Sequence, residues 1–302
     1  DVCYQTPGHD NYNANEATTI SRVRTGSNSS LNITGDIDIR AYVEPETWKQ
    51  EQVIAAKWKV ERFSGAGADN RASWVFQINS DGTLSFIWNN GSTDNVFGAY
   101  KRVTSTAAVP AAIRQYVRVT LDVNNGASGN TATFYTSTDG SSWTTLGSAV
   151  VTSGTTSIYS SITPVTIGAL EGFTDIYGLT YDINSNSMDI NDSVFPLGDN
   201  WVPIARPFLG KIYNVSIRNG IAGTVVASPT FTSAINGSYS ITDSQGNVWV
   251  IDGLGVFTNR HYRHHGEITS WPQPRTSEGN FAWVDIESSG VLQREQQGEE
   301  PE

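Results

Sequence analysis

The sequence predicts an all-β protein, a sandwich or jelly roll of two antiparallel sheets. Three observations lead to this prediction. Helical periodicity is nearly absent from the 302 residues. Apolar and polar residues instead alternate with a period of two in many short segments, and Asp-Gly and similar turn sequences separate these segments. Strands that alternate without intervening helices favour antiparallel sheets, and the lack of a fixed repeat disfavours a propeller or a solenoid.

The N-terminal half supplies the clearest strands. Residues 36–43 form the first of them, because Ile37, Ile39, Ala41 and Val43 share one face. A β-hairpin is predicted next, since Trp74, Phe76 and Ile78 are followed by Ser80-Asp81-Gly82-Thr83 and then by Leu84, Phe86 and Trp88. Further strands are expected at residues 115–123 and 131–138, with a turn at Asp139-Gly140.

The C-terminal half contains fewer strands and two irregular stretches. Strands are predicted at 164–170 and 210–218, and a hairpin at 238–251 turns at Ser244-Gln245-Gly246-Asn247. We therefore expect a jelly roll over residues 1–256 with a long insertion loop at 171–209. Residues 257–302 are expected to form a C-terminal extension that ends in a flexible acidic tail.

Composition limits the classes of partner. The chain has 19 Lys and Arg against 30 Asp and Glu, a net charge of −11. Nucleic acid is not an expected partner, because binding to phosphates needs clustered basic residues. No uninterrupted apolar run is long enough to span a bilayer, so no membrane insertion is expected. The single cysteine, Cys3, excludes an intramolecular disulfide.

Three stretches resemble a known family. They are residues 33–40 (ITGDIDIR) with the following Trp48, residues 210–220 (GKIYNVSIRNG) and residues 244–253 (SQGNVWVIDG). Together they resemble the concanavalin A-like jelly roll of the laminin-G type found in minor tail proteins and other virion proteins of bacteriophages that infect actinobacteria. The resemblance spans about residues 10–256.

The resemblance implies a non-enzymatic structural protein of a virion, a minor tail or decoration protein with the tail favoured over the capsid. Its implied partners are other virion proteins, copies of itself and glycans of the host envelope. The first alternative is a carbohydrate-binding module of a secreted protein, and the second is a glycoside hydrolase of the same fold.

The sequence offers no catalytic residues. Laminarinase-type enzymes of this architecture carry Glu-x-Asp-x-x-Glu on one strand, so that nucleophile and acid project from the same face. The nearest string here is Asp36-Ile37-Asp38-Ile39-Arg40-Ala41, which lacks both glutamates. Asp285-Ile286-Glu287 pairs two acids without a third at the required spacing. Hydrolysis by retention needs two closely spaced carboxyl groups, so we expect no enzymatic activity.

Aromatic and amide residues near strand ends suit a glycan site, because sugar faces stack on rings and sugar hydroxyls bind amides. The competing interpretation of Trp88 is a core residue, since it alternates with core-facing positions. The candidate carbohydrate-binding residues are Trp88, Asn90, Asp94, Tyr177, Tyr181 and Trp201.

No cofactor motif is complete, and calcium is the one cofactor left open. Asp182, Asn184 and Asn186 match the first ligands of a calcium loop, but Ser187 and Ser193 replace the Gly and Glu that an EF-hand requires. An irregular oxygen site that includes Asp189 remains one interpretation, and Asn/Asp turns are the other. His261, His264 and His265 could hold zinc, but the adjacent Arg260 and Arg263 favour a subunit contact.

Overall fold

The computed structural model describes residues 3–5, 22–48, 50–59, 71–91, 100–171, 206–234, 238–252, 256–258, 267–268 and 288–289. The chain divides into two compact units, Asp1–Asn259 and Arg260–Glu302. In the second unit the described residues are those of a short antiparallel pair, β18 (Glu267–Ile268) and β19 (Ser288–Ser289). The first unit contains the sandwich.

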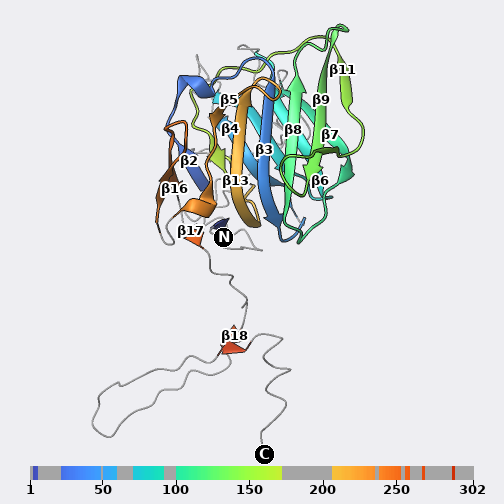
Figure 1. Ribbon diagram of the computed structural model, residues 1–302. Helices are drawn as coiled ribbons and strands as arrows, with labels where there is room; N and C mark the ends of the chain where they lie inside the picture. The colour runs from blue at the N-terminus through green and yellow to red at the C-terminus, as the bar shows by residue number, and fades with distance from the viewer. Residues whose placement is uncertain are drawn as a thin grey trace, which may run out of the picture. The chain divides into compact units, whose positions relative to one another are not determined.

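The first sheet has the strand order β10-β9-β8-β3-β13-β1-β17, with β11 paired to β9 and β14 paired to β13 (Figure 1). All of its pairs are antiparallel. Its strands are β1 (Cys3–Gln5), β3 (Ile37–Pro45), β8 (Gln115–Asp122), β9 (Gly129–Ser137), β10 (Thr144–Thr145), β11 (Val150–Ser153), β13 (Gly210–Asn219), β14 (Thr224–Ala227) and β17 (Val256–Thr258).

The second sheet has the order β15-β16-β2-β12-β4-β5-β6-β7 and is also antiparallel throughout. It contains β2 (Arg22–Thr25), β4 (Gln52–Lys59), β5 (Arg71–Ile78), β6 (Thr83–Asn89), β7 (Tyr100–Ala108), β12 (Thr166–Ile167), β15 (Ser240–Thr242) and β16 (Val248–Asp252). Only two short 3₁₀ turns, η2 (Ser29–Leu31) and η3 (Phe231–Ser233), interrupt the strands and loops among the described residues. The predicted fold class, an all-β jelly-roll sandwich of two antiparallel sheets, is confirmed.

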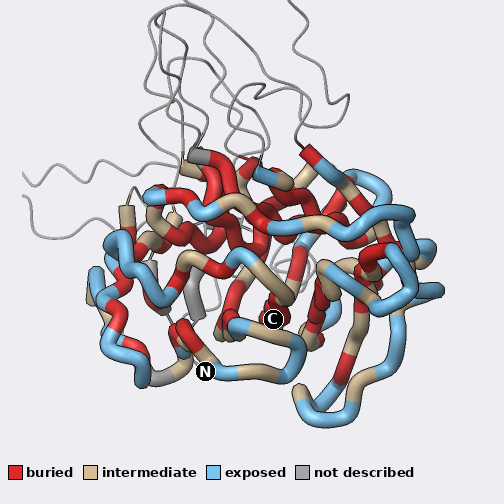
Figure 2. Tube along the Cα trace, turned by 90° about the horizontal axis from the view of Figure 1, so that it is seen from above, coloured by how far each residue is buried: buried red, intermediate tan, exposed pale blue. Residues whose placement is uncertain are grey.

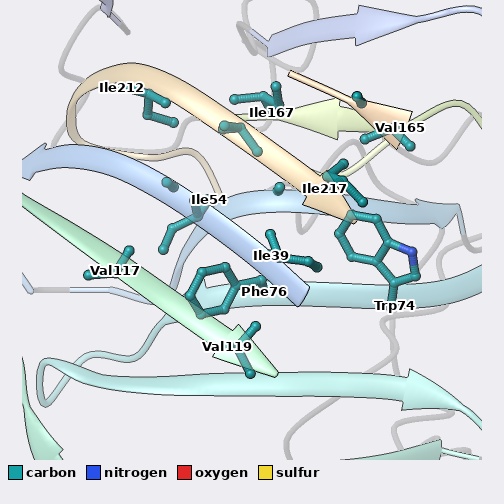
Figure 3. Packing of buried hydrophobic residues seen from close by; sticks show 14 of the residues in the cluster. Ile39, Ile54, Trp74, Phe76, Val117, Val119, Val165, Ile167, Ile212 and Ile217 are labelled. Atoms are coloured by element: carbon teal, nitrogen blue, oxygen red, sulfur yellow. The ribbon is translucent and has the colours of Figure 1, made fainter. Parts of the chain in front are cut away.

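The core lies between the two sheets (Figures 2 and 3). Inward residues of β3 and β8, such as Ile39 and Val119, pack in one cluster with Trp74 and Phe76 of β5. All four are 1% exposed or less. The period of two seen in the sequence therefore marks the inner face of each strand correctly, because successive side chains point to opposite sides of a sheet.

The predicted hairpin with its turn near Asp81-Gly82 is confirmed as β5–β6. Ile78 faces Leu84 and Trp74 faces Trp88 across the two strands. The turn contains Gly82 at φ +81°, a conformation that L-residues with a Cβ rarely adopt. A Cβ on Gly82 would also lie 2.9 Å from the ring of Trp48, so this position requires glycine for two reasons.

The second sheet differs from the simple prediction of one buried and one solvated face. Its outer side carries a further buried apolar cluster that includes Trp58, Val75 and Ile87. The polar residue Gln77 on the same side is fully buried, and its side-chain oxygen accepts a 2.8 Å hydrogen bond from Arg206. A buried amide needs such a partner, so this polar position is compatible with a covered sheet face.

Two boundaries predicted from the sequence change in the structure. The boundary at Val256 falls inside β17, because Phe257 is fully buried and stacks on Phe231 at 5.3 Å between ring centroids. The sandwich thus extends through Thr258. Within the predicted insertion, Phe208 is fully buried and its N–H donates to Gly168, so the end of that segment belongs to the core.

Candidate functional site

The outer face of the first sheet presents a lattice of arginine and aromatic side chains. It lies on β13, β3, β8 and β9, which run side by side in the front layer of Figure 1. Alternation with the buried inner residues places these side chains on the opposite side of the sheet. In register, Arg218 faces Asp38, Arg40 faces Arg118, and Tyr42 faces Tyr116. We call this the arginine–aromatic face; its members are Arg40, Arg118, Arg218, Tyr42, Tyr116, Tyr135 and Trp143.

Asp38 is the centre of this face. Its carboxylate accepts two hydrogen bonds from Arg118, both 2.9 Å, and two from Arg40, at 3.2 and 2.8 Å. The backbone N–H of Ala222 donates a further bond at 3.0 Å. Asp38 is fully buried, whereas the side chain of Arg40 is 20% exposed. The carboxylate is thus enclosed while one of its arginines still meets solvent.

Opposing effects set the charge state of Asp38. Burial alone would raise its pKa, but hydrogen bonds from Arg40 and Arg118 and the charge of Arg118 hold the pKa below its usual value. The group is therefore ionised at neutral pH. An ionised carboxylate has about four lone-pair positions, so the donors already present occupy its accepting capacity.

Aromatic rings surround the arginines. Tyr42 and Tyr116 stack with centroids 4.0 Å apart and planes 9° from parallel. Trp143, just before β10, meets the edge of Tyr116 at 6.5 Å, and both Arg40 and Arg118 lie 5.5 Å from its ring centroid. Trp143 and both tyrosines are only partly buried. Cation–π contacts of this kind hold a guanidinium in place without neutralising its charge.

Next to the stacked tyrosines, toward the C-terminal end of β3, lies a further group of charged and aromatic side chains. Arg114 lies 3.7 Å from the ring centroid of Tyr213 and 4.8 Å from that of Tyr42. The hydroxyl of Tyr213 donates to Glu44 at 2.7 Å, and Lys211 forms an ion pair with Glu44 at 3.3 Å. At this end of the face, Lys211 is paired with Glu44, and Arg114 lies against the rings of Tyr42 and Tyr213.

A second polar network lies on the other sheet. Arg102 and Arg206 both pair with Glu51, at 3.1 and 2.6 Å. Arg102 also donates to Asn79, and the amide of Asn79 donates to Ser85. Arg206 is 7% exposed. Its charged groups bind one another, and Arg206 also donates to Gln77 of β5. The network therefore attaches the segment that follows residue 205 to this sheet.

Of the candidate glycan residues, the structure describes Trp88 and Asn90. Trp88 is 1% exposed, and its indole N–H donates to Thr156 at 2.9 Å, so its ring fills the core and offers no face to a sugar. Asn90 is partly buried, and its backbone oxygen accepts a hydrogen bond from Ser157. The other four predicted residues, Asp94, Tyr177, Tyr181 and Trp201, lie outside the described residues.

The predicted calcium ligands Asp182, Asn184, Asn186 and Asp189 also lie outside the described residues, as do His261, His264 and His265. Within the described ranges, no three His, Cys, Asp or Glu side chains gather in a way that could hold a metal ion. The same part of the chain contains no helix of sufficient length and apolarity to cross a membrane.

Of the acids compared with a catalytic strand, Asp36 accepts a 2.9 Å hydrogen bond from the backbone of Val123, and Asp38 is held by two arginines. Asp285 and Glu287 lie outside the described residues. The chemistry offered by the arginine–aromatic face is therefore recognition of an anion or of a ring face, through fixed guanidinium and aromatic groups.

The sequence analysis did not predict the arginine–aromatic face. Asp38, Arg40 and Tyr42 alternate with buried residues, a pattern that equally describes an ordinary solvated strand face. The arginines come together only because β3 pairs with β8 and β13, whose residues lie far away along the chain. The available signal was three outward arginines, at positions 40, 118 and 218, in predicted strands of an acidic protein.

Comparisons with known proteins identify no family. No protein-family profile matches the sequence, and no curated protein matches it. Among solved structures, the chain is similar to a native heptameric SAP-like pentraxin from Limulus polyphemus, with a TM-score of 0.39 and 11% sequence identity over 73% of this chain and 76% of that one. At this level of similarity, neither the assembly nor any property of the pentraxin is carried over to this chain.

Proposed function

We propose that this chain is a non-enzymatic structural and binding protein of a bacteriophage virion, in the tail rather than the capsid. Its partners in this proposal are other virion proteins and copies of itself, and its exposed sheet face contacts a glycan of the host envelope. The proposal combines the laminin-G-type resemblance of the sequence with the arginine–aromatic face.

The stretches that carry the resemblance occupy connected parts of the sandwich, which supports their use as fold markers. β3 and β13 pair along their whole length, from Gly210 opposite Pro45 to Asn219 opposite Ile37. The turn before β16 is organised by Asp243, which accepts hydrogen bonds from the backbone of Gln245 and Asn247. The resemblance therefore rests on residues that build the fold.

The non-enzymatic part of the proposal rests on the burial of Asp38 and on its hydrogen bonds to two arginines. In a retaining glycoside hydrolase, two carboxyl groups must be available to the substrate, one as nucleophile and one as acid. Here the outward carboxylate of β3, the strand with the sequence nearest to that catalytic pattern, is fully buried and bound by Arg40 and Arg118. It serves to position guanidinium groups, a role suited to binding.

The test is a protein inventory and three-dimensional reconstruction of particles purified from the phage that encodes the chain. We expect this sandwich at a fixed, symmetric position on the tail. Absence of the chain from purified particles would overturn the proposal. Release of reducing ends from a laminarin or other β-glucan would overturn its non-enzymatic part and favour the hydrolase alternative.

A second candidate function is a carbohydrate-binding module of a secreted protein. The arginine–aromatic face favours it, because partly exposed rings beside fixed polar groups suit a saccharide in either setting. A catalytic domain in the same full-length protein, together with absence from virions, would support this alternative.

A further inference from the structure

The region around Asp38 has more cations than its single carboxylate can satisfy. Arg40, Arg118 and the backbone of Ala222 bind Asp38 directly, and Arg218 lies opposite it on β13. The cluster thus carries two more positive than negative charges. This excess is notable in a protein with a net charge of −11.

Arg218 is the arginine left without a carboxylate partner in this cluster. Its Nη1 donates to the backbone oxygen of Gly223 at 3.1 Å, while its Nε is buried with no acceptor in the part of the chain that the structure describes. Burial and the charges of Arg40 and Arg118 lower the pKa of Arg218, although the nearby charge of Asp38 acts in the opposite direction. These conditions make an added negative charge favourable.

The other carboxylates along these strands are engaged elsewhere. Asp36, just before β3, binds the backbone of Val123, and Asp122, at the end of β8, binds the backbone of Asn124. Glu44 binds Lys211 and Tyr213. None of these contacts balances the positive excess at Arg218 and Arg40.

We propose that the arginine–aromatic face binds a carboxylate-bearing saccharide, with the carboxylate at the solvent edge of Arg40 and Arg218. A planar carboxylate fits the fork of a guanidinium, as Asp38 already does on this face. The partly exposed rings of Trp143 and Tyr135 lie next to the arginines and supply surfaces for sugar rings. A saccharide uses both features, whereas an acidic peptide needs only the first.

This inference deepens the proposed glycan contact by naming its surface and ligand class. The proposed function supplies only the biological source of the saccharide, the host envelope; the binding site itself is argued from the structure. Binding of the purified protein to a saccharide is measured independently of whether the chain occurs in a virion.

The experiment is titration calorimetry of the full chain with trigalacturonate, and with its methyl ester as the uncharged match. We expect the acid to bind and the ester to bind at least about tenfold more weakly, because the ester lacks the anion that the arginines recognise. Binding of the acid should also weaken as salt is raised, since ions screen partly exposed charges.

Two variants locate the site and one controls for charge. Arg218→Gln should weaken binding of trigalacturonate at least about tenfold. Ser216→Asp, opposite Arg40 on β13, keeps every arginine but adds a carboxylate within the chain, and should also abolish binding. Lys101→Gln removes an exposed cation from β7 on the other sheet and should change affinity less than about twofold.

The thermal midpoint of each variant checks that it is folded, and Ser216→Asp carries the test if Arg218→Gln fails to fold. Equal binding of acid and ester, no binding of either, or unchanged affinity in Ser216→Asp would overturn the proposal. Equal affinity for a glutamate trimer would overturn the saccharide assignment, because it would show that the rings contribute nothing.

Discussion

Arg118 and Asp38 form a bidentate ion pair across β3 and β8, with both N–O distances at 2.9 Å. Asp38 is fully buried, and the side chain of Arg118 is 10% exposed. Removing one partner of such a pair is costly, because it leaves a desolvated charge without compensation. This pair therefore links the stability of the first sheet to the geometry of the arginine–aromatic face.

Asp38→Asn should destabilise the protein by about 3–5 kcal/mol at pH 7. Because the pKa of Asp38 is lowered in the folded protein, the contribution of its charge is present above the usual value of 3.8 and is lost as the pH falls through the folded pKa. The difference between the two proteins should thus shrink in acid. Urea unfolding at pH 7 and at a series of values below pH 4 measures this.

The matched control is Asp252→Asn. Asp252 pairs with Arg22 at 2.8 Å, but its side chain is 43% exposed, so the loss should stay below about 1 kcal/mol. Equal unfolding midpoints for the two variants would contradict the special role of Asp38.

Lys57→Met should stabilise the protein. Lys57 is 1% exposed on β4, its Nζ donates to the backbone oxygen of Thr163, and burial lowers its pKa from 10.5 to about 8. A pKa lowered by this amount means that burying the charged amine is costly at pH 7, and methionine removes that cost. After the lost hydrogen bond is deducted, we expect a gain of about 2 kcal/mol in the free energy of unfolding.

The pH dependence has a definite sign. Between about pH 8 and 10.5 the unfolded chain binds more protons at Lys57 than the folded chain does, so the contribution of Lys57 to the stability of the wild-type protein rises with pH there. The Lys57→Met variant lacks this rise, and the gap between the two should close by pH 10.5. Lys101→Met, at an exposed position, is the control; a constant gap for Lys57→Met across this range would refute the prediction.

Gly82→Ala should cost more stability than Gly246→Ala. Both glycines have φ +81°, so both substitutions carry the same left-handed strain of about 1–2 kcal/mol. A Cβ at Gly82 additionally meets the Trp48 ring at 2.9 Å, whereas a Cβ at Gly246 meets nothing within 4 Å. Urea midpoints of the two variants separate strain from collision, and equal losses would mean that Trp48 moves aside without cost.

Truncation after Asn259 should leave the thermal midpoint close to that of the full chain, while truncation after Val256 should lower it. The shorter chain loses Phe257, which is fully buried, and most of β17, which pairs with β1. Deleting a buried phenylalanine side chain typically costs about 3–5 kcal/mol. Differential scanning calorimetry of the two truncated chains measures the difference, and indistinguishable midpoints would contradict the place of Phe257 in the core.

The same truncation after Asn259 tests self-association. We expect the full chain to associate through residues beyond the sandwich, because Trp271, Phe281 and Trp283 supply apolar area that gains from burial. Sedimentation of the full chain should therefore show oligomers that the truncated chain does not form. Monomers in both cases would reject association through this segment.

The sequence by itself determined the fold class and the inward faces of the strands. Ile37, Ile39, Ala41 and Val43 alternate with polar residues, and all four are fully buried in β3. The hairpin around Gly82 could also be predicted from the sequence, because turn chemistry and the period of two are local properties. The burial of both faces of β5 could not be predicted from the sequence. Val75 and Gln77 are buried by chain segments that lie elsewhere in the sequence, such as the one that contains Arg206.

The candidate site was decided by tertiary structure. The sequence left Trp88 between a sugar site and the core, and the packing of the sheets places its ring in the core. Arg40, Arg118 and Arg218 could be predicted to face outward, but not to lie together, because an outward arginine on one strand resembles any solvated residue. They form a cluster because β3 pairs with β8 on one side and with β13 on the other, which places Arg118 and Arg218 on either side of Asp38. Pairing between distant strands depends on the whole core, so charge clustering across a sheet cannot be deduced from alternation within one strand.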